Sequence, residues 1–211
     1  MFGGWRQSRK ARRAAQEKLD QLNAALEIPP EDRDLGRLYP IILPPELLEK
    51  EWPGPILPLR QAHCAVGWAE VRERNVWTYV SHAMADHWEH DGYDWRRIAY
   101  QNLRRASTPG ANGEKLDEAG RPFIKVMIQE DALGPSRLLI PHLFDSELGP
   151  DYQVAIPERT CAVAFRNALE PQEESVVSSM IDGCYRNGTE PMSPNRYAAS
   201  IFWTAVEEAG W

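Results

Sequence analysis

Proline crowding is the feature that most restricts how this chain can fold. Eight of its 17 prolines lie between Pro29 and Pro58. Proline removes a backbone N–H and disfavours helical geometry both at its own position and at the residue before it. We therefore expect residues 29–60 to form a largely extended segment, with one short helix over residues 46–51 between two groups of prolines.

This segment separates a helical N-terminus from the rest of the chain. Residues 1–26 hold six Lys or Arg residues against two acidic ones, and their apolar side chains recur at helical spacing. We expect residues 1–28 to form a basic amphipathic helix that docks on a partner or on a second copy of the chain, and that the domain does not need in order to fold. Residues 61–211 then form the main domain, and residues 29–211 form one folding unit. The helical stripe consists of Ala11, Ala15, Leu19, Leu22 and Leu26.

Charge and composition exclude several classes of function. The formal net charge is −7, and the basic N-terminus leaves −11 on the remaining residues. An acidic body repels phosphate backbones, so we expect no nucleic-acid partner. The chain has neither an apolar run of about 18 residues nor a secretory signal pattern, so we expect a cytoplasmic protein without a transmembrane segment. Three cysteines cannot all be paired, and we expect them to be reduced and mostly buried.

Beyond residue 61 the apolar pattern predicts an α+β fold, mainly an antiparallel sheet packed with helices. Short alternating runs predict two antiparallel hairpins, one from residues 65–71 and 76–80, the other from residues 152–156 and 161–165. Single runs over residues 123–129 and 197–206 predict two further strands.

Helical spacing alternates with these strands. We expect the helix over residues 95–106, with Asp94 as its N-cap, to pack on the same sheet as the second hairpin. We expect Gly188 to end the last long helix, and residues 107–120 to form a polar, mobile loop. The further helical segments are residues 81–89, residues 136–148 with a kink or restart at Pro141, and residues 173–187.

Motifs for common cofactors and nucleophiles are missing from the sequence. It contains no G-x-G-x-x-G, no G-x-x-x-x-G-K-[ST], no G-x-S-x-G and no C-x-x-C. We therefore assign no cofactor and no catalytic residue.

One histidine-rich segment has a spacing that suits metal binding. His82, Asp86 and His90 are spaced i, i+4, i+8, which places them on one face of a helix and suits a divalent ion. We expect the helix to end near Glu89, leaving His90 outside it, and so expect no stoichiometric metal at His82, Asp86, His87 or His90. A metal bound there would favour the alternative hypothesis of a metal-dependent hydrolase.

Tryptophan and arginine supply the candidate partner-binding residues. The chain has eight tryptophans, and aromatic residues of this size usually anchor a core. An exposed pair of Trp88 and Trp95 would instead mark a partner surface, together with Arg96 and Arg97. Arg159, in a hairpin turn whose charges we expect to be solvated, is a further candidate as a clamp for a carboxylate or phosphate.

Asn102 lies at the edge of the apolar stripe of residues 95–106. Because a buried amide needs partners, we expect Asn102 to bind the backbone of a neighbouring loop or strand and so to fix how the helix docks.

Three segments share their order and spacing with a known bacterial family. Residues 93–104, YDWRRIAYQNLR, resemble the "A..NL" helix of the YtpQ-like proteins, and residues 135–139, PSRLL, resemble that family's "SR-I/L-L" helix start. Residues 151–160, DYQVAIPERT, are similar to its "hydrophobic-A-hydrophobic-P" strand and turn. The resemblance covers roughly residues 38–206 and implies an intracellular α+β domain. The family has no established activity, so the resemblance implies no cofactor or catalytic residue.

Together these observations indicate a non-enzymatic cytoplasmic protein that binds a protein partner or associates with itself, as an accessory or regulatory protein. The alternative is a hydrolase, with or without a metal ion, that uses the segment from His82 to His90.

Overall fold

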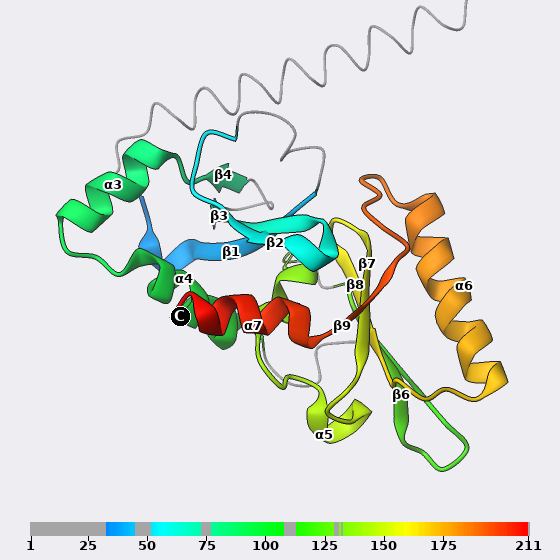
Figure 1. Ribbon diagram of the computed structural model, residues 1–211. Coiled ribbons are helices and arrows are strands. Elements are labelled where there is room, and N and C mark those ends of the chain that lie inside the picture. Colours follow the sequence, from blue (N-terminus) through cyan, green and yellow to red (C-terminus); the bar gives the residue numbers. More distant parts are fainter. Residues whose placement is uncertain are drawn as a thin grey trace, which may run out of the picture.

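The protein has the α+β class expected from its sequence, with two antiparallel sheets packed with helices. The computed structural model describes residues 33–44, 52–72, 77–107, 113–128, 131 and 133–210. The helices expected over residues 1–28 and 46–51 lie outside these described residues. Figure 1 shows α3 (His82–His90) and α4 (Trp95–Ala106) on one side of the molecule and α6 (Pro171–Asn187) on the other, with the sheets between them.

The first sheet is built around β3 (Cys64–Val71), a strand that is buried along almost its whole length. It pairs antiparallel with β1 (Leu38–Leu43), β2 (Leu57–Leu59) and β4 (Trp77–Tyr79). The β3–β4 pair confirms the first expected hairpin. The strands β1 and β2 come from the proline-rich segment, which also contains a short 3-10 helix, η2 (Leu35–Arg37), where the structure describes it. β1 pairs only with β3 among the described strands, and an edge strand of this kind tolerates Pro40.

The second sheet has the strand order β5-β6-β8-β7-β9. Its central strands β7 (Gln153–Glu158) and β8 (Cys161–Phe165) pair antiparallel, as expected for the second hairpin. Every residue of β8 is buried, because its alternate side chains belong to two different core clusters. The outer strands are β6 (Pro122–Met127), β5 (Gly113–Leu116) and β9 (Arg196–Ala198).

The strand β5 corrects the expectation of an irregular loop over residues 107–120. It pairs with β6 through a tight turn in which Asp117 accepts the backbone N–H groups of Ala119 and Arg121 and Gly120 has a φ of 76°. All four β5 residues are exposed, so no apolar alternation signals the strand.

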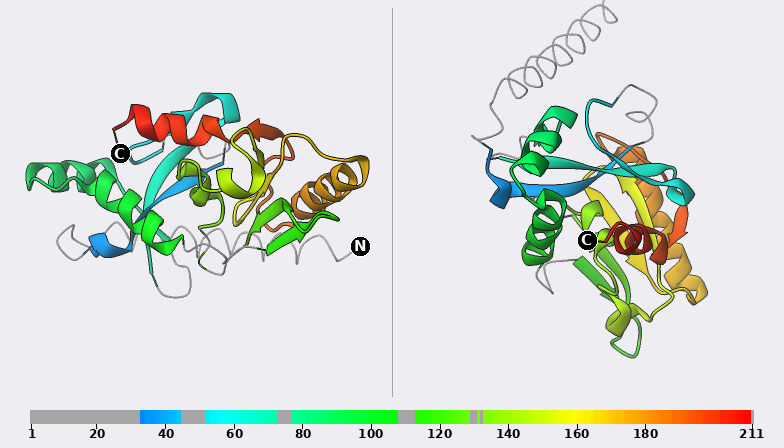
Figure 2. Two further views of the ribbon diagram at one scale, coloured as in Figure 1. Left: turned by 90° about the horizontal axis from the view of Figure 1, so that it is seen from below. Right: turned by 60° about the vertical axis from the view of Figure 1, so that its left-hand side comes forward.

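Two helices cover different sheets. The helix α4 packs on β1 of the first sheet, whereas α6 packs on β7 and β8 of the second. The expectation that residues 95–106 pack on the sheet of the second hairpin is therefore wrong. Figure 2 shows the same separation of α4 and α6 from two other directions. The caps are as expected, with Asp94 accepting the Arg97 N–H and Gly188 ending α6.

Two other segments differ from their expected form. Residues 136–148 form a buried 3-10 helix, η5 (Pro135–Leu139), and a short helix, α5 (Asp145–Leu148), so the helix restarts, as one alternative expected, but beyond Pro141, and its first part is not an α-helix. Pro141 and the left-handed backbone of His142, with a φ of 57°, separate them. The expected strand over residues 197–206 is mostly the helix α7 (Ser200–Glu208), which buries Phe202 and Val206 at a spacing of four.

The core falls into two clusters on opposite faces of the second sheet. The larger cluster joins the first sheet, α3, α4, α7 and η5 to one face of β7 and β8. The smaller one lies under α6 and contains Val163, Phe165, Val177 and Ile181. α6 is thus held by its own small core.

Candidate functional site

A groove of about 1160 Å³ lies between the β5–β6 hairpin and the first turns of α6. We call it the α6 groove. The hairpin turn contributes one wall, the N-terminal end of α6 contributes the other, and residues at the end of β8 lie between them. Its described lining contains three cationic side chains, Lys115, Arg121 and Arg166, and four acidic ones, Asp117, Glu118, Glu170 and Glu173.

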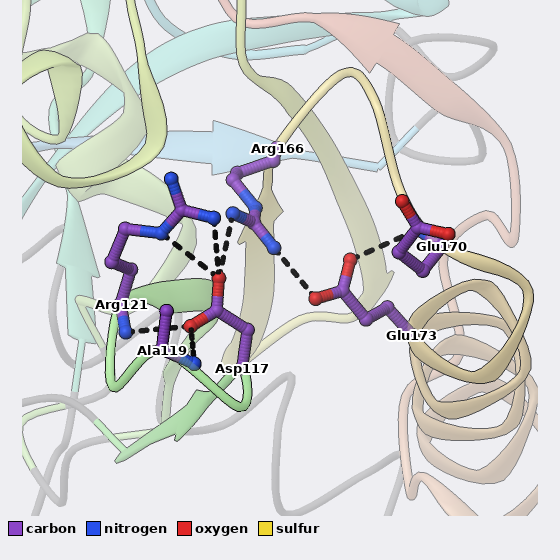
Figure 3. Close-up of polar contacts among 6 residues, drawn as sticks. All are labelled: Asp117, Ala119, Arg121, Arg166, Glu170 and Glu173. Atoms are coloured by element: carbon purple, nitrogen blue, oxygen red, sulfur yellow. Dashed lines mark hydrogen bonds and ion pairs between the residues drawn. The ribbon is translucent and has the colours of Figure 1, made fainter.

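A chain of ion pairs crosses the groove, as Figure 3 shows. Asp117 Oδ2 accepts hydrogen bonds from Arg121 Nε at 3.1 Å and from Arg166 Nη1 at 3.1 Å. Arg166 Nη2 donates in turn to Glu173 Oε1 at 2.6 Å, and Glu173 Oε2 accepts the Glu170 N–H at 3.0 Å. The chain thus links the hairpin turn, the end of β8 and the start of α6.

Local sequence explains how these side chains are held. Asp117 bonds the backbone of its own turn, a common arrangement for Asp in turns. Glu173 lies in the first turn of α6, where it forms a capping box with Glu170 and where Pro171 suits the start of a helix. Arg166 follows β8 directly and so projects from the rigid centre of the sheet.

The groove holds charged side chains in fixed ion pairs. The backbone N–H of Arg121, with its guanidinium and that of Arg166, holds the pKa of Asp117 below its ordinary value. Among the described residues that line the groove there is no His, Cys, Ser or Thr. The groove thus presents fixed charges of both signs and the apolar side chains of Leu116, Phe123 and Val176.

No protein-family model, no curated protein and no solved structure matches this chain. The resemblance to the YtpQ-like proteins therefore stays a prediction. Within the described ranges, no helix is both long enough and apolar enough to cross a membrane.

The tryptophan pair proposed for partner binding is buried in the core. Trp88 is 3% exposed and Trp95 is 1% exposed. Trp95 packs edge-on against Trp68, with ring centroids 5.1 Å apart, and donates its indole N–H to Glu89. Arg96 lies over the Trp95 ring at 4.2 Å and pairs with Glu89 at 2.6 Å. The partner-binding assignment of Trp88 and Trp95 is therefore wrong, and the default role of core anchor applies.

The remaining arginine candidates lie in different places. Arg97 is exposed on α4. Arg159, expected in a solvated turn, instead donates to Glu190 Oε2 at 3.0 Å and to the Tyr79 hydroxyl, and lies over the Trp77 ring at 5.1 Å. It therefore clamps a carboxylate of its own chain and links the second sheet to β4 of the first.

Asn102 binds the backbone of a neighbouring segment, as expected from its place on the helix. Its amide Nδ2 donates to the carbonyl of Leu35 at 2.7 Å and to that of Leu38 at 3.0 Å. Both acceptors belong to the segment that leads into β1, so Asn102 fixes how α4 docks on the first sheet.

The histidine-rich segment forms α3, and His90 is its last residue rather than lying beyond its end. His82, Asp86 and His90 are exposed. In the part of the chain that the structure describes, no three His, Cys, Asp or Glu side chains come close enough together to hold a metal ion. α3 lies on the opposite side of the molecule from α6 (Figure 1).

Sequence reasoning missed the α6 groove. The Asp117 to Gly120 turn carries a hairpin signal, because Asp and Gly at these positions are typical turn residues. The pairing of Arg166 with Asp117, which lies 49 positions earlier, has no local signal. It depends on the order of strands in the second sheet.

Proposed function

We propose that this protein is a non-enzymatic cytoplasmic accessory protein that binds an extended segment of a partner polypeptide. The segment adds to the outer edge of β5 and places its side chains in the α6 groove. The observation that supports this proposal is the position of β5, an edge strand beside a large groove. Among the described strands, β5 pairs with β6 alone.

The backbone of β5 supports this mode of binding. An edge strand presents N–H and C=O groups that a further strand can bind, and peptide recognition by strand addition uses these groups for affinity. All four residues from Gly113 to Leu116 are exposed, so no side chain of the strand is needed inside the core.

Exposed apolar side chains support it as well. Leu116 at the end of β5 is 50% exposed, and Ile128 just beyond β6 is 61% exposed. They lie at opposite ends of the same hairpin. A bound segment that follows the length of the hairpin would cover both side chains and remove their apolar surface from water.

The lining of the groove favours a particular kind of segment. Three cations face four carboxylates, so the groove has no excess positive charge for a phosphate group. A peptide of mixed charge with at least one large apolar side chain fits this lining, because it can exchange ion pairs with Arg121 and Arg166 and cover Leu116.

Selection from a displayed library of random linear 12-mer peptides tests the proposal. The enriched peptides are synthesised and added to isotope-labelled protein, and backbone amide shifts are recorded. We expect the shifts to cluster on residues 113–128 and on the first turns of α6. No enrichment, or shifts that cluster on α3 and α4, would contradict the proposal.

Two matched controls sharpen this experiment. N-methylation of alternate peptide amides should abolish binding for one of the two alternating sets and leave it for the other, because a strand offers only every second N–H to its neighbour. Leu116→Ser should weaken binding about tenfold, a loss of roughly 1.4 kcal/mol. Ile56→Ser, at an apolar residue that is 40% exposed in the first sheet region, should leave it unchanged.

A further inference from the structure

Two of the three cysteines meet where α6 packs on the second sheet. Cys161 is the first residue of β8, and Cys184 lies 23 positions later in α6. Their Sγ atoms are 3.6 Å apart. We call them the thiol pair. Both are free thiols, and a disulfide would require the sulfurs to approach to about 2.05 Å.

We propose that the thiol pair is a peroxide-oxidised modification site, at which Cys184 reacts first and Cys161 then closes a reversible disulfide between α6 and β8. The inference does not depend on the function proposed for the α6 groove, because it concerns the opposite end of α6.

The two thiols differ in their access to solvent, and this difference sets the order in which they react with peroxide. Cys161 is 1% exposed, whereas Cys184 is partly exposed. An oxidant from solution therefore reaches Cys184 first. Burial raises the pKa of Cys161, and the neighbouring Cys184 and Glu158 raise it further, so Cys161 remains a thiol until its neighbour has been oxidised.

The chemistry balances with hydrogen peroxide as the only co-reactant. The Cys184 sulfur attacks one peroxide oxygen, the O–O bond breaks, and the thiol proton leaves in water, giving a sulfenic acid. The Cys161 sulfur then attacks the Cys184 sulfur, the S–O bond breaks, and the departing hydroxide takes the Cys161 proton to form a second water. Two thiols are oxidised to one disulfide, and one peroxide is reduced to two waters.

The third cysteine is a control within the same chain. Cys64 begins β3 in the first sheet and is 5% exposed. Burial raises the pKa of Cys64 to about 12. A thiol that is both buried and un-ionised reacts slowly with peroxide.

Mass spectrometry of the full chain tests the proposal. The reduced protein is treated with hydrogen peroxide, remaining thiols are alkylated after unfolding, and the protein is digested. We expect a cross-linked Cys161–Cys184 peptide that is lighter by two hydrogen atoms than its reduced parts, with Cys64 still alkylated. The melting temperature should rise by about 5 °C or more and return after reduction with dithiothreitol, because the cross-link constrains the unfolded chain.

Single variants separate the two steps. In Cys161→Ser, dimedone should trap a sulfenic acid on Cys184, since no partner thiol is left to react with it. In Cys184→Ser, Cys161 should stay reduced, and Cys64→Ser should behave as the unchanged protein does. The proposal fails if Cys184 is oxidised in the unchanged protein without the cross-link, if the cross-link involves Cys64, or if peroxide leaves all three thiols reduced.

Discussion

The two ends of α6 are held by different kinds of interaction. At its start, Glu173 pairs with Arg166 beside a groove that is open to solvent. Near its end, Ile181 is 2% exposed in the smaller core, and the helix stops against the buried carboxylate of Glu158. A Cβ added to Gly188 would lie only 2.3 Å from Glu158 Cγ.

Two carboxylates, one at each end of α6, therefore contribute differently to the stability of the fold. Glu173 and Glu158 are both buried carboxylates, 9% and 7% exposed, but their donors differ. Glu173 accepts from the Arg166 guanidinium and the Glu170 N–H, whereas Glu158 accepts four hydrogen bonds from neutral groups. Arg166 is 19% exposed and also pairs with Asp117, so it keeps a partner when Glu173 is changed, whereas removal of the Glu158 carboxylate leaves partly buried donors without hydrogen bonds. We therefore infer that the apolar stripe of Val177 and Ile181 fixes the position of α6, and that its first turn presents charges to the groove.

Truncation of the apolar anchor should have the largest effect. Ile181→Ala should lower the free energy of unfolding by about 2–5 kcal/mol, because it leaves a cavity in the core under α6. Val176→Ala, at a partly buried residue that lines the groove, should have less than half this effect. Urea denaturation measures both. Equal losses would show that packing is uniform along the helix.

Replacement of the buried carboxylate should rank second. Glu158 Oε2 accepts from Thr160 N at 2.7 Å and Thr160 Oγ1 at 2.6 Å, and Oε1 accepts from Thr189 Oγ1 and Glu190 N at 3.3 Å. Glu158→Gln places a donor where an acceptor is needed and should lower the free energy of unfolding by about 1–3 kcal/mol. Glu208→Gln, at the exposed end of α7, is the control and should be neutral.

The same substitution at the groove end should have a smaller effect. Glu173→Gln weakens the pairing with Arg166 but keeps an oxygen for the Glu170 N–H. Because Arg166 keeps its pair with Asp117, we expect a loss of about 0.5–1 kcal/mol, less than for Glu158→Gln, in the same denaturation assay. A larger loss here than at Glu158 would reverse the comparison between the two ends.

Acid should affect the hairpin turn least of all. The pKa of Asp117 is below its ordinary value of 3.8, so the stabilisation from its charged form is complete above about pH 4 and is lost as the pH falls through the lower, folded-state value. A carboxyl-detected NMR titration measures this pKa. Arg166→Met should raise it only slightly, because the hydrogen bond from the Arg121 backbone is the main cause of the shift. A return to the ordinary value would instead make Arg166 the main cause.

Much of the local structure could be predicted from sequence. Asp94 and Gly188 mark helix ends through their own backbone and side-chain preferences, and the alternation in residues 152–156 and 161–165 fixes the β7–β8 pair. The backbone role of Asn102 follows from its place at the edge of an apolar stripe. In each case the information lies within a few residues of the feature.

The errors arose where distant parts of the chain decide the outcome. The exposed strand β5 exists because β6 offers it a partner, and polar residues alone do not signal it. The sheet on which α4 packs depends on β1, which lies more than 50 positions earlier. The high apolar content of residues 197–206 predicts a strand, whereas the spacing of four between Phe202 and Val206 agrees with the helix α7. The α6 groove depends on three separate elements, so no single segment could have revealed it.

The complete burial of β8 has a consequence for measurement. Its amides lie between β6 and β7, with a core cluster on each face, so they can exchange with deuterium only when the whole domain opens. Their slow exchange therefore reports the global free energy of unfolding directly. The amides of β5, at the edge of the same sheet, exchange through local fluctuations. One hydrogen-exchange experiment therefore measures global unfolding at β8 and local opening at β5.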